Sequence, residues 1–504
     1  MCARLILLAT LLSVPTVAHA QWSSDPAVNT LVSGDMTSCV ITHTAATADG
    51  GVWIAWYDAS AGYDIVVQKL DTSGTPVFTQ PALVQDQSLS WVQDFDLAAV
   101  GDDCAIAWAD GTVIGAALVN ADGTIAWQHD LHDGNGYQAN AQVCGANDGF
   151  TVVGWMDENV SKVQRIATDG TFAWSTPVTI GGSGYYAMSD LKPASDHDVI
   201  VSMVYYTSFN GAKTLKAQRV RADGSLAWPA PTIDVFTQGS LQYGGYPEFI
   251  ADDTGGGIFT WYSTSNLQSY IQWIDGDGMK LFGTQGALIA TTSGMLHTGP
   301  SACFDHGVGE VTAFCTRQTS NQAEDGVQAN RFGPNGTAMW GAAGVEIDPL
   351  SGAWAVLDLQ AHQVGSLATV SWLGMNVTMQ GTIRTQAVDV NGAMLWGTTP
   401  VDLGAPAITR SDLTGASAGD MLVAVWSDAR DGVDRVYAQN INADGVLGDS
   451  VCAADIDGDG VVGVDDLLVL IAAWGTSDED ADVNGDGTVS TEDLLLVLAG
   501  WGIC

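Results

Sequence analysis

The stretch WIAWYDASAGYDIVVQKLDTSGTPVF, from Trp53 to Phe78, contains one copy of a pattern that recurs along most of the chain. An apolar strand ends in aromatic residues and an acid, and the next strand carries Gln68. Gly74 follows that glutamine after six residues, and Phe78 follows after four more. Because glycine between two alternating segments favours a hairpin turn, the stretch predicts consecutive antiparallel strands.

The pair of turn glycine and aromatic residue recurs along the chain. The pairs are Gly74–Phe78, Gly123–Trp127, Gly170–Trp174, Gly224–Trp228, Gly278–Phe282, Gly336–Trp340 and Gly392–Trp396. Glycine to glycine, the steps up to Gly445 run from 47 to 58 residues. Each unit has room for about four strands, which is the size of a propeller blade.

The eighth unit reaches Gly445 without an aromatic strand behind it, and the missing strand stands at the other end of the chain. Gln21-Trp22, followed by Pro26-Ala27-Val28, resembles the segments after Trp174 and Trp340. An N-terminal strand that completes the last blade would close the ring without a bare edge. The sequence therefore predicts a mainly β fold with an eight-bladed propeller. Seven blades remain the alternative if one irregular unit is an insertion, and an open β-solenoid is less favoured.

Two acidic runs near the C-terminus carry the clearest chemistry of the chain. They are DIDGDGVVGVDD, Asp455 to Asp466, and DVNGDGTVSTED, Asp482 to Asp493. Oxygen side chains at loop positions 1, 3, 5 and 12, with glycine at position 6, match a loop for a hard cation with six or more oxygen ligands. Two Ca²⁺ ions are therefore expected. The expected ligands are Asp455, Asp457, Asp459, the Val461 carbonyl and Asp466 in the first loop, and Asp482, Asn484, Asp486, the Thr488 carbonyl and Asp493 in the second.

The loop starts lie 27 residues apart, which leaves room for one helix after each loop. An EF-hand pair needs two helices for each loop. The duplicated loop-and-helix unit from Cys452 to Cys504 resembles the type I dockerin, with its F-hand calcium loops. That resemblance implies a small α-helical module that binds a protein when calcium is present. Its partner would be a cohesin-like or another cell-surface protein.

Charge and apolar surface add to this expectation. The segment from Cys452 to Cys504 contains ten Asp, two Glu and no Lys or Arg, a formal charge of −12. Two calcium ions neutralise four of these charges, so we expect folding of the module to be linked to the metal. Leu467 to Trp474 and Leu494 to Trp501 are apolar nearly all round, so part of their surface is expected to meet a partner.

The N-terminus indicates export. Residues 1–20 read as a secretory signal peptide, with Arg4, an apolar run and Ala18-His19-Ala20 before Gln21. No later stretch reaches 18 uninterrupted apolar residues, so no transmembrane segment is expected. The predicted organisation is a signal peptide at 1–20, a propeller at 21–450 and a calcium module at 451–504. A formal charge of −41 argues against nucleic-acid binding, and we expect a secreted or cell-surface protein.

Seven cysteines follow Cys2, in a chain expected to be oxidised. Cys452 and Cys504 bracket the calcium module and are one candidate disulfide. Cys303 and Cys315 flank an expected hairpin and are the other. The pairing of Cys39, Cys104 and Cys144 is left open.

The propeller sequence contains no recognisable catalytic motif. It has neither a spaced metal set of histidines nor a GxSxG or phosphate loop. We therefore expect a non-catalytic binding or structural head, with a polysaccharide as one candidate ligand. The alternative is a carbohydrate-active hydrolase whose two carboxylates are brought together by distant loops. A third interpretation makes the C-terminal unit a sorting or surface-retention tag.

Overall fold

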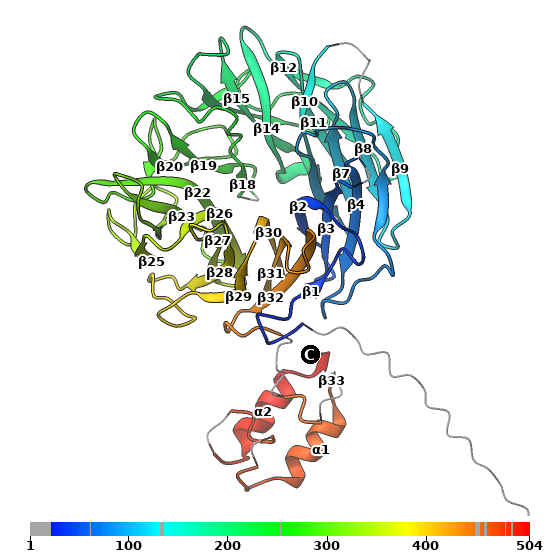
Figure 1. Cartoon of the computed structure of the whole chain (residues 1–504), viewed down its shortest axis with the longest axis vertical. Helices are drawn as coiled ribbons and strands as arrows, with labels where there is room; N and C mark the ends of the chain where they lie inside the picture. The colour runs from blue at the N-terminus through cyan, green and yellow to red at the C-terminus, as the bar shows by residue number, and fades with distance from the viewer. Residues whose placement is uncertain are drawn as a thin grey trace, which may run out of the picture.

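The computed structural model describes residues 22–60, 62–131, 136–252, 254–448, 454–457, 461–478, 480–484 and 487–503. In this part of the chain, eight four-stranded antiparallel sheets are arranged in a ring (Figure 1). The prediction of an eight-bladed propeller is confirmed. The seven-bladed and solenoid alternatives are wrong, because every unit of the repeat forms one complete blade.

Each of the first seven blades consists of four consecutive strands. Blade 1 has β2 (Cys39–Ala46), β3 (Val52–Asp58), β4 (Asp64–Leu70) and β5 (Ala82–Gln85); blade 2 has β6 (Asp96–Val100), β7 (Asp103–Ala109), β8 (Ile114–Val119) and β9 (Ile125–Asp130); blade 3 has β10 (Gln138–Gly145), β11 (Thr151–Asp157), β12 (Val160–Ile166) and β13 (Val178–Ile180); blade 4 has β14 (Tyr185–Pro193), β15 (Val199–Tyr206), β16 (Thr214–Val220) and β17 (Ile233–Phe236). A 3-10 turn, η1 (Ser195–His197), lies between β14 and β15.

The remaining blades follow the same order until the ring closes. Blade 5 has β18 (Phe249–Ala251), β19 (Gly257–Ser263), β20 (Gln268–Ile274) and β21 (Ala287–Leu288); blade 6 has β22 (Met295–Asp305), β23 (Glu310–Thr319), β24 (Asp325–Phe332) and β25 (Val345–Ser351); blade 7 has β26 (Ala355–Val364), β27 (Leu367–Met375), β28 (Gly381–Val388) and β29 (Val401–Ile408); blade 8 has β30 (Arg410–Ala418), β31 (Met421–Asp428), β32 (Arg435–Asn442) and, from the N-terminus, β1 (Thr30–Leu31).

The two ends of the propeller meet in blade 8, as the sequence predicts. β1 pairs with β32, with Thr30 opposite Ala438 and Leu31 opposite Tyr437. The paired residues lie slightly later than the expected Pro26–Val28, which precede the strand. The N-terminal segment thus supplies the fourth strand, and the last blade has no bare edge on that side.

The recurring glycine and aromatic residues join neighbouring blades. All eight turn glycines have φ between +76° and +87°, the left-handed region that glycine adopts without strain. A Cβ added to any of them would lie 2.4–3.4 Å from the aromatic side chain of the preceding blade, counting Trp22 as the aromatic of blade 8. Each repeat therefore needs glycine both for the turn and for the packing of the adjacent ring.

The recurring glutamine ties the third strand of a blade to its aromatic segment. Gln68 accepts a hydrogen bond from the backbone N–H of Phe78 and donates one to the Phe78 carbonyl. In blade 8, Gln439 donates to the carbonyl of Ser23, at 2.7 Å. This contact places the residues around Trp22 where the other blades have their own aromatic segment.

The C-terminal residues form two helices and a short ribbon. α1 (Val464–Ala472) follows the first acidic loop, and α2 (Thr491–Ala499) follows the second. β33 (Val461–Val462) pairs with β34 (Gly502–Ile503), so the start of the first helix lies beside the end of the second. None of the helices in the described part of the chain has the length and apolar character needed to span a bilayer.

Candidate functional site

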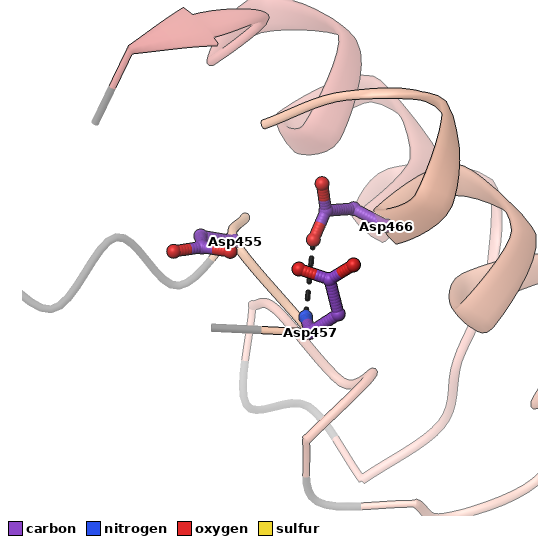
Figure 2. Close-up of side chains that lie close together, drawn as sticks. All are labelled: Asp455, Asp457 and Asp466. Atoms are coloured by element: carbon purple, nitrogen blue, oxygen red, sulfur yellow. Dashed lines mark hydrogen bonds between the residues drawn. The ribbon is translucent and has the colours of Figure 1, made fainter. Parts of the chain in front are cut away.

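The first acidic loop brings together three of its predicted ligands. One carboxylate oxygen each of Asp455, Asp457 and Asp466 lies within 4.8 Å of the other two (Figure 2). Asp455 and Asp457 come from the loop, and Asp466 comes from the first turn of α1. Three carboxylates at this separation repel one another unless a cation lies between them, and their oxygens are the donors that Ca²⁺ prefers.

Asp466 also organises the loop through its hydrogen bonds. Its side chain is buried, and one oxygen accepts the backbone N–H groups of Ile456 at 2.7 Å and Asp457 at 3.1 Å. The other oxygen accepts the N–H of Gly463 at 2.7 Å. Burial alone would raise the pKa of Asp466, but these backbone donors outweigh it and hold the pKa below its usual value. Asp466 is therefore ionised at neutral pH.

The second loop repeats these bonds at equivalent positions. Asp493 is fully buried and accepts the N–H groups of Asn484 at 3.0 Å and Ser490 at 2.7 Å. Asn484 corresponds to Asp457 and Ser490 to Gly463 in the loop numbering. Backbone donors again outweigh burial and lower the pKa of Asp493. The duplication seen in the sequence thus extends to the hydrogen bonds of the position-12 acid.

The other predicted ligands fall into two groups. Asp482 accepts the N–H of Gly487 at 2.6 Å, and Asn484, Val461 and Thr488 lie in the same loops. Asp459 and Asp486 lie outside the described residues, as do Cys452 and Cys504 of the predicted disulfide. The described residues fit a calcium loop because their side chains offer oxygen donors without competing nitrogen or sulfur.

Much of the helical surface beside these loops is apolar and exposed. The module core contains Ala454, Val462, Leu470, Ala481, Val489 and Val497. Nine large apolar side chains remain 39–60% exposed: Val464, Leu468, Val469, Ile471, Trp474, Leu495, Leu496, Leu498 and Trp501. The two helices therefore bury one face against each other and leave a second apolar face in water.

The expected disulfide between Cys303 and Cys315 is wrong. Both are free, buried thiols on the adjacent strands β22 and β23. Cys303 lies opposite Thr312 rather than Cys315, and the two thiols belong to apolar clusters on opposite faces of the sheet. Because side chains alternate along a strand, the odd offset directs them apart. Cys39, Cys104 and Cys144 are also free and buried.

The first strands of the blades lie innermost, around the axis where a propeller has its central channel (Figure 1). In six blades this strand contains a β-bulge, and the first paired residue after the bulge occupies an equivalent position in each blade. Bulges redirect side chains, often next to functional sites. The residues at this position around the ring are His43, Asp96, Gln142, Asp190, Ser301, Gln360 and Thr414, with Glu248 taking the equivalent place just before β18.

The charged members of this ring interact with charged residues beside them. Lys192 lies 3.0 Å from Asp190, and His43 lies 2.8 Å from Asp94. Desolvation raises the pKa of Asp96 to about 6, although Lys192 opposes the shift. Desolvation also raises the pKa of Glu248, with Lys192 opposing and Asp190 adding to the shift. The Glu248 side chain is exposed and lines a neighbouring cavity.

Sequence patterns did not single out these channel residues. The repeat of turn glycine and aromatic residue is regular, but the side chain at the channel position changes from blade to blade. The sequence does contain one signal for these residues. Each channel residue is paired with the residue that directly precedes a tryptophan on the second strand of its blade, as at Trp56, Trp108 and Trp155. Counting from those tryptophans would have found the channel ring.

No protein-family model matches the chain, and no curated protein matches it. Solved structures match the propeller architecture. The β-propeller domain of the Trilobed protease from Pyrococcus furiosus is 9% identical, with a TM-score of 0.41 over 73% of this chain and 98% of that one. A puromycin hydrolase is 11% identical, with a TM-score of 0.45 over 81% of this chain and 62% of that one. The polysaccharide lyase Uly1 is 9% identical, with a TM-score of 0.40 over 86% and 94%. At these values the matches carry no argument about activity.

Proposed function

We propose that this chain is an exported binding protein with two working parts. The propeller is a non-catalytic binding head, and the C-terminal unit is a dockerin-like module that Ca²⁺ folds and that attaches the head to a cell-surface or scaffold protein. The observation that carries the proposal is the repeated bonding of Asp466 and Asp493. Each buried acid accepts backbone N–H groups of its own loop, at the position where a calcium loop has its last acidic ligand.

Electrostatics supports the dependence on calcium. The module carries a formal charge of −12 and no basic residue, so its acids repel one another without a counter-ion. Two Ca²⁺ ions would neutralise four of these charges where they are most crowded. Binding free energy at such a site contributes directly to folding.

The exposed apolar helices support attachment to a protein. Apolar side chains exposed on both helices, on an otherwise acidic module, are typical of a surface that a partner covers. The signal-like residues 1–20 lie outside the described residues and support export by their sequence alone.

Calcium titration of the full-length chain tests this proposal. We expect two bound Ca²⁺ ions by equilibrium dialysis, and slower hydrogen exchange in residues 461–478 and 487–503 when calcium is present. Propeller peptides provide the internal control and should exchange equally with calcium and with chelator. Magnesium at the same concentration should protect the module less, because Mg²⁺ requires tighter octahedral geometry. A module equally protected in chelator would contradict the proposal.

A hydrolase is the second candidate, and Glu248 is the observation that favours it. This acid has a raised pKa and lines a cavity of about 380 Å³ beside the channel, as a general acid would. A hydrolase also needs a second carboxylate, and the two nearby acids, Asp190 and Asp96, are already engaged in hydrogen bonds to the backbone. Asp190 accepts the N–H groups of Leu191 and Phe249, and Asp96 accepts those of Leu97 and Val143. Both acids connect neighbouring blades, so the geometry favours a binding head.

The two candidates differ in an assay for reducing ends. We expect the full-length chain to release none from a panel of polysaccharides, and the Glu248→Gln variant to behave identically. A hydrolase with Glu248 as general acid would be active only while that acid is protonated. Its rate would fall as the pH rises through the raised pKa, and Glu248→Gln would abolish it. Such a pH profile would contradict the proposal of a binding head and identify the propeller as an enzyme.

A further inference from the structure

One face of the propeller carries a cavity whose walls are rich in aromatic rings. The cavity has a volume of about 880 Å³, within the range of sites that hold small ligands. We call it the aromatic groove, and its rings are Tyr137, Tyr185, Tyr206, Phe209, Tyr243 and Tyr246. They come from three blades: Tyr137 precedes β10, Tyr185 and Tyr206 belong to β14 and β15, and the others lie in loops before β16 and β18.

Most of these rings are exposed, and four of them pack against one another in pairs. Five of them are 40–65% exposed, which is unusual for so many aromatic side chains in one place. Tyr185 and Tyr206 stack with centroids 4.9 Å apart and planes 9° from parallel. Phe209 and Tyr243 meet edge to face at 5.1 Å. Rings already ordered before binding lose little conformational entropy when a ligand arrives.

Lys213 fixes the loops that carry the outer rings. Its ammonium group donates to the carbonyls of Phe209 at 2.9 Å and Gly211 at 3.1 Å. The same group lies 5.4 Å from the ring centroid of Tyr206 and 5.2 Å from that of Tyr243. The lysine is almost completely buried, so it holds the rings in place and leaves their outer faces to a ligand.

The groove continues toward the centre of the propeller. Tyr246 lines both the aromatic groove and the cavity of about 380 Å³ that contains Glu248. The second cavity also contains Gln242, Ser301 and Gln360, of which the last two belong to the channel ring. The two cavities thus lie on either side of Tyr246, with aromatic faces in the outer one and hydrogen-bonding groups in the inner one. This arrangement suits a chain molecule better than a single compact ligand.

The charge of the protein and the side chains of the two cavities restrict the chemical class of the ligand. The protein has a formal charge of −41, and Glu158 and Glu248 line the two cavities, so uronic-acid and sulfated polymers are repelled. A sugar ring presents C–H groups on its face, which pack on aromatic rings, and hydroxyl groups at its edge. Tyrosine hydroxyls, Asn140, Asn159 and Gln242 can exchange hydrogen bonds with those hydroxyl groups.

We propose that the aromatic groove binds a neutral polysaccharide along a path from Tyr185 past Tyr246 to Glu248. This rests on the proposed role of the propeller as a binding head and names its ligand class. Several sugar units would lie in the site at once, because the two cavities together exceed the space of one small ligand. The rings supply most of the affinity, and the inner polar groups set the position of the chain.

Affinity electrophoresis and calorimetry of the full-length chain test the inference. The probes are soluble neutral glucans, mannans and xylans, with polygalacturonate as the charged comparison. We expect one neutral polymer to bind and polygalacturonate not to bind. Phe209→Ala and Tyr243→Ala should each weaken binding about tenfold or more, since each removes one exposed ring. Trp91→Ala removes a ring of similar exposure outside the groove and should leave the affinity unchanged.

The outcomes separate this inference from the proposed function. Binding should persist in chelator, because the groove contains no residue of the calcium loops. Unchanged affinity in both groove variants, binding of polygalacturonate alone, or a protein ligand in place of any glycan would overturn the inference. A failed calcium titration with intact polysaccharide binding would instead contradict the attachment module and leave the groove assignment standing.

Discussion

Replacing Trp22 with alanine should lower the free energy of unfolding of the propeller by about 3–5 kcal/mol, the usual cost of truncating a buried tryptophan. The indole is 4% exposed, and its N–H donates to the carbonyl of Thr72 at 3.1 Å. The ring packs directly on Gly74, where an added Cβ would lie 2.6 Å away. Trp22 thus fastens the N-terminal segment to blade 1.

The N-terminal segment is also bonded to the last two blades. Gln439 donates to Ser23, Asn29 donates to the carbonyl of Leu403 at 2.9 Å, and Ala405 donates to the carbonyl of Pro26 at 3.0 Å. Loss of the Trp22 ring should therefore release the closing strand as well as create a cavity. This combination distinguishes Trp22 from the equivalent tryptophans inside the chain.

Trp228→Ala is the matched control. Trp228 is 3% exposed, donates to the carbonyl of Gly276 at 3.0 Å and packs on Gly278, but it joins two blades that are continuous in sequence. Both variants should unfold at lower denaturant concentration. Limited proteolysis under native conditions should cut near residues 22–31 only in Trp22→Ala. Equal protection of that segment in the two variants would contradict the closing role of Trp22.

The sequence predicted the propeller because the features that build it are local and periodic. A glycine with positive φ, an aromatic residue four positions later and a strand tryptophan recur in nearly every blade, so their spacing gives the number of blades. The same spacing predicted the closure, since Trp22 is an aromatic residue with no blade of its own. What the glutamine does was not predictable, because its partner lies ten residues away across a turn.

The aromatic groove was not predictable for the opposite reason. Tyr137, Tyr206 and Tyr243 lie at unequal positions in three different blades, and their proximity depends on the rotation from one blade to the next.

The prediction of a disulfide between Cys303 and Cys315 failed for a related reason. Cys303 and Cys315 are close in sequence and lie on paired strands, but the register of the hairpin, which sets Cys303 opposite Thr312, places the two thiols on opposite faces of the sheet.

The calcium loops are an intermediate case. Spacing alone predicted the oxygen donors, and three of the four first-loop carboxylates fall in the described residues and converge. Spacing did not reveal that Asp466 and Asp493 also hold the loop backbone. This second role follows from the burial of both acids, which requires hydrogen bonds to their oxygens.

Asp466→Ala should remove calcium from the first loop and unfold much of the module. The substitution deletes one metal ligand and leaves the N–H groups of Ile456, Asp457 and Gly463 without the carboxylate that accepts them. A typical hydrogen bond contributes about 0.5–1.5 kcal/mol to stability, and the apolar core that must offset three such losses contains six buried residues in the described part of the module. Equilibrium dialysis should find at most one bound Ca²⁺, and residues 461–478 should exchange rapidly at any calcium concentration.

Asp465→Ala provides the control for charge. It removes the same negative charge from the same helical turn, but Asp465 is exposed and lies at loop position 11, outside the ligand set. This variant should keep two bound ions and, because repulsion is reduced, should hold its module folded at lower calcium. If Asp465→Ala lost calcium as completely as Asp466→Ala, total charge rather than loop geometry would govern binding.

Asp466→Asn separates metal binding from the support of the loop backbone. Its single oxygen can still accept from Ile456 and Asp457, while its amide group faces the N–H of Gly463, so it should bind calcium weakly and retain more protection than the alanine variant.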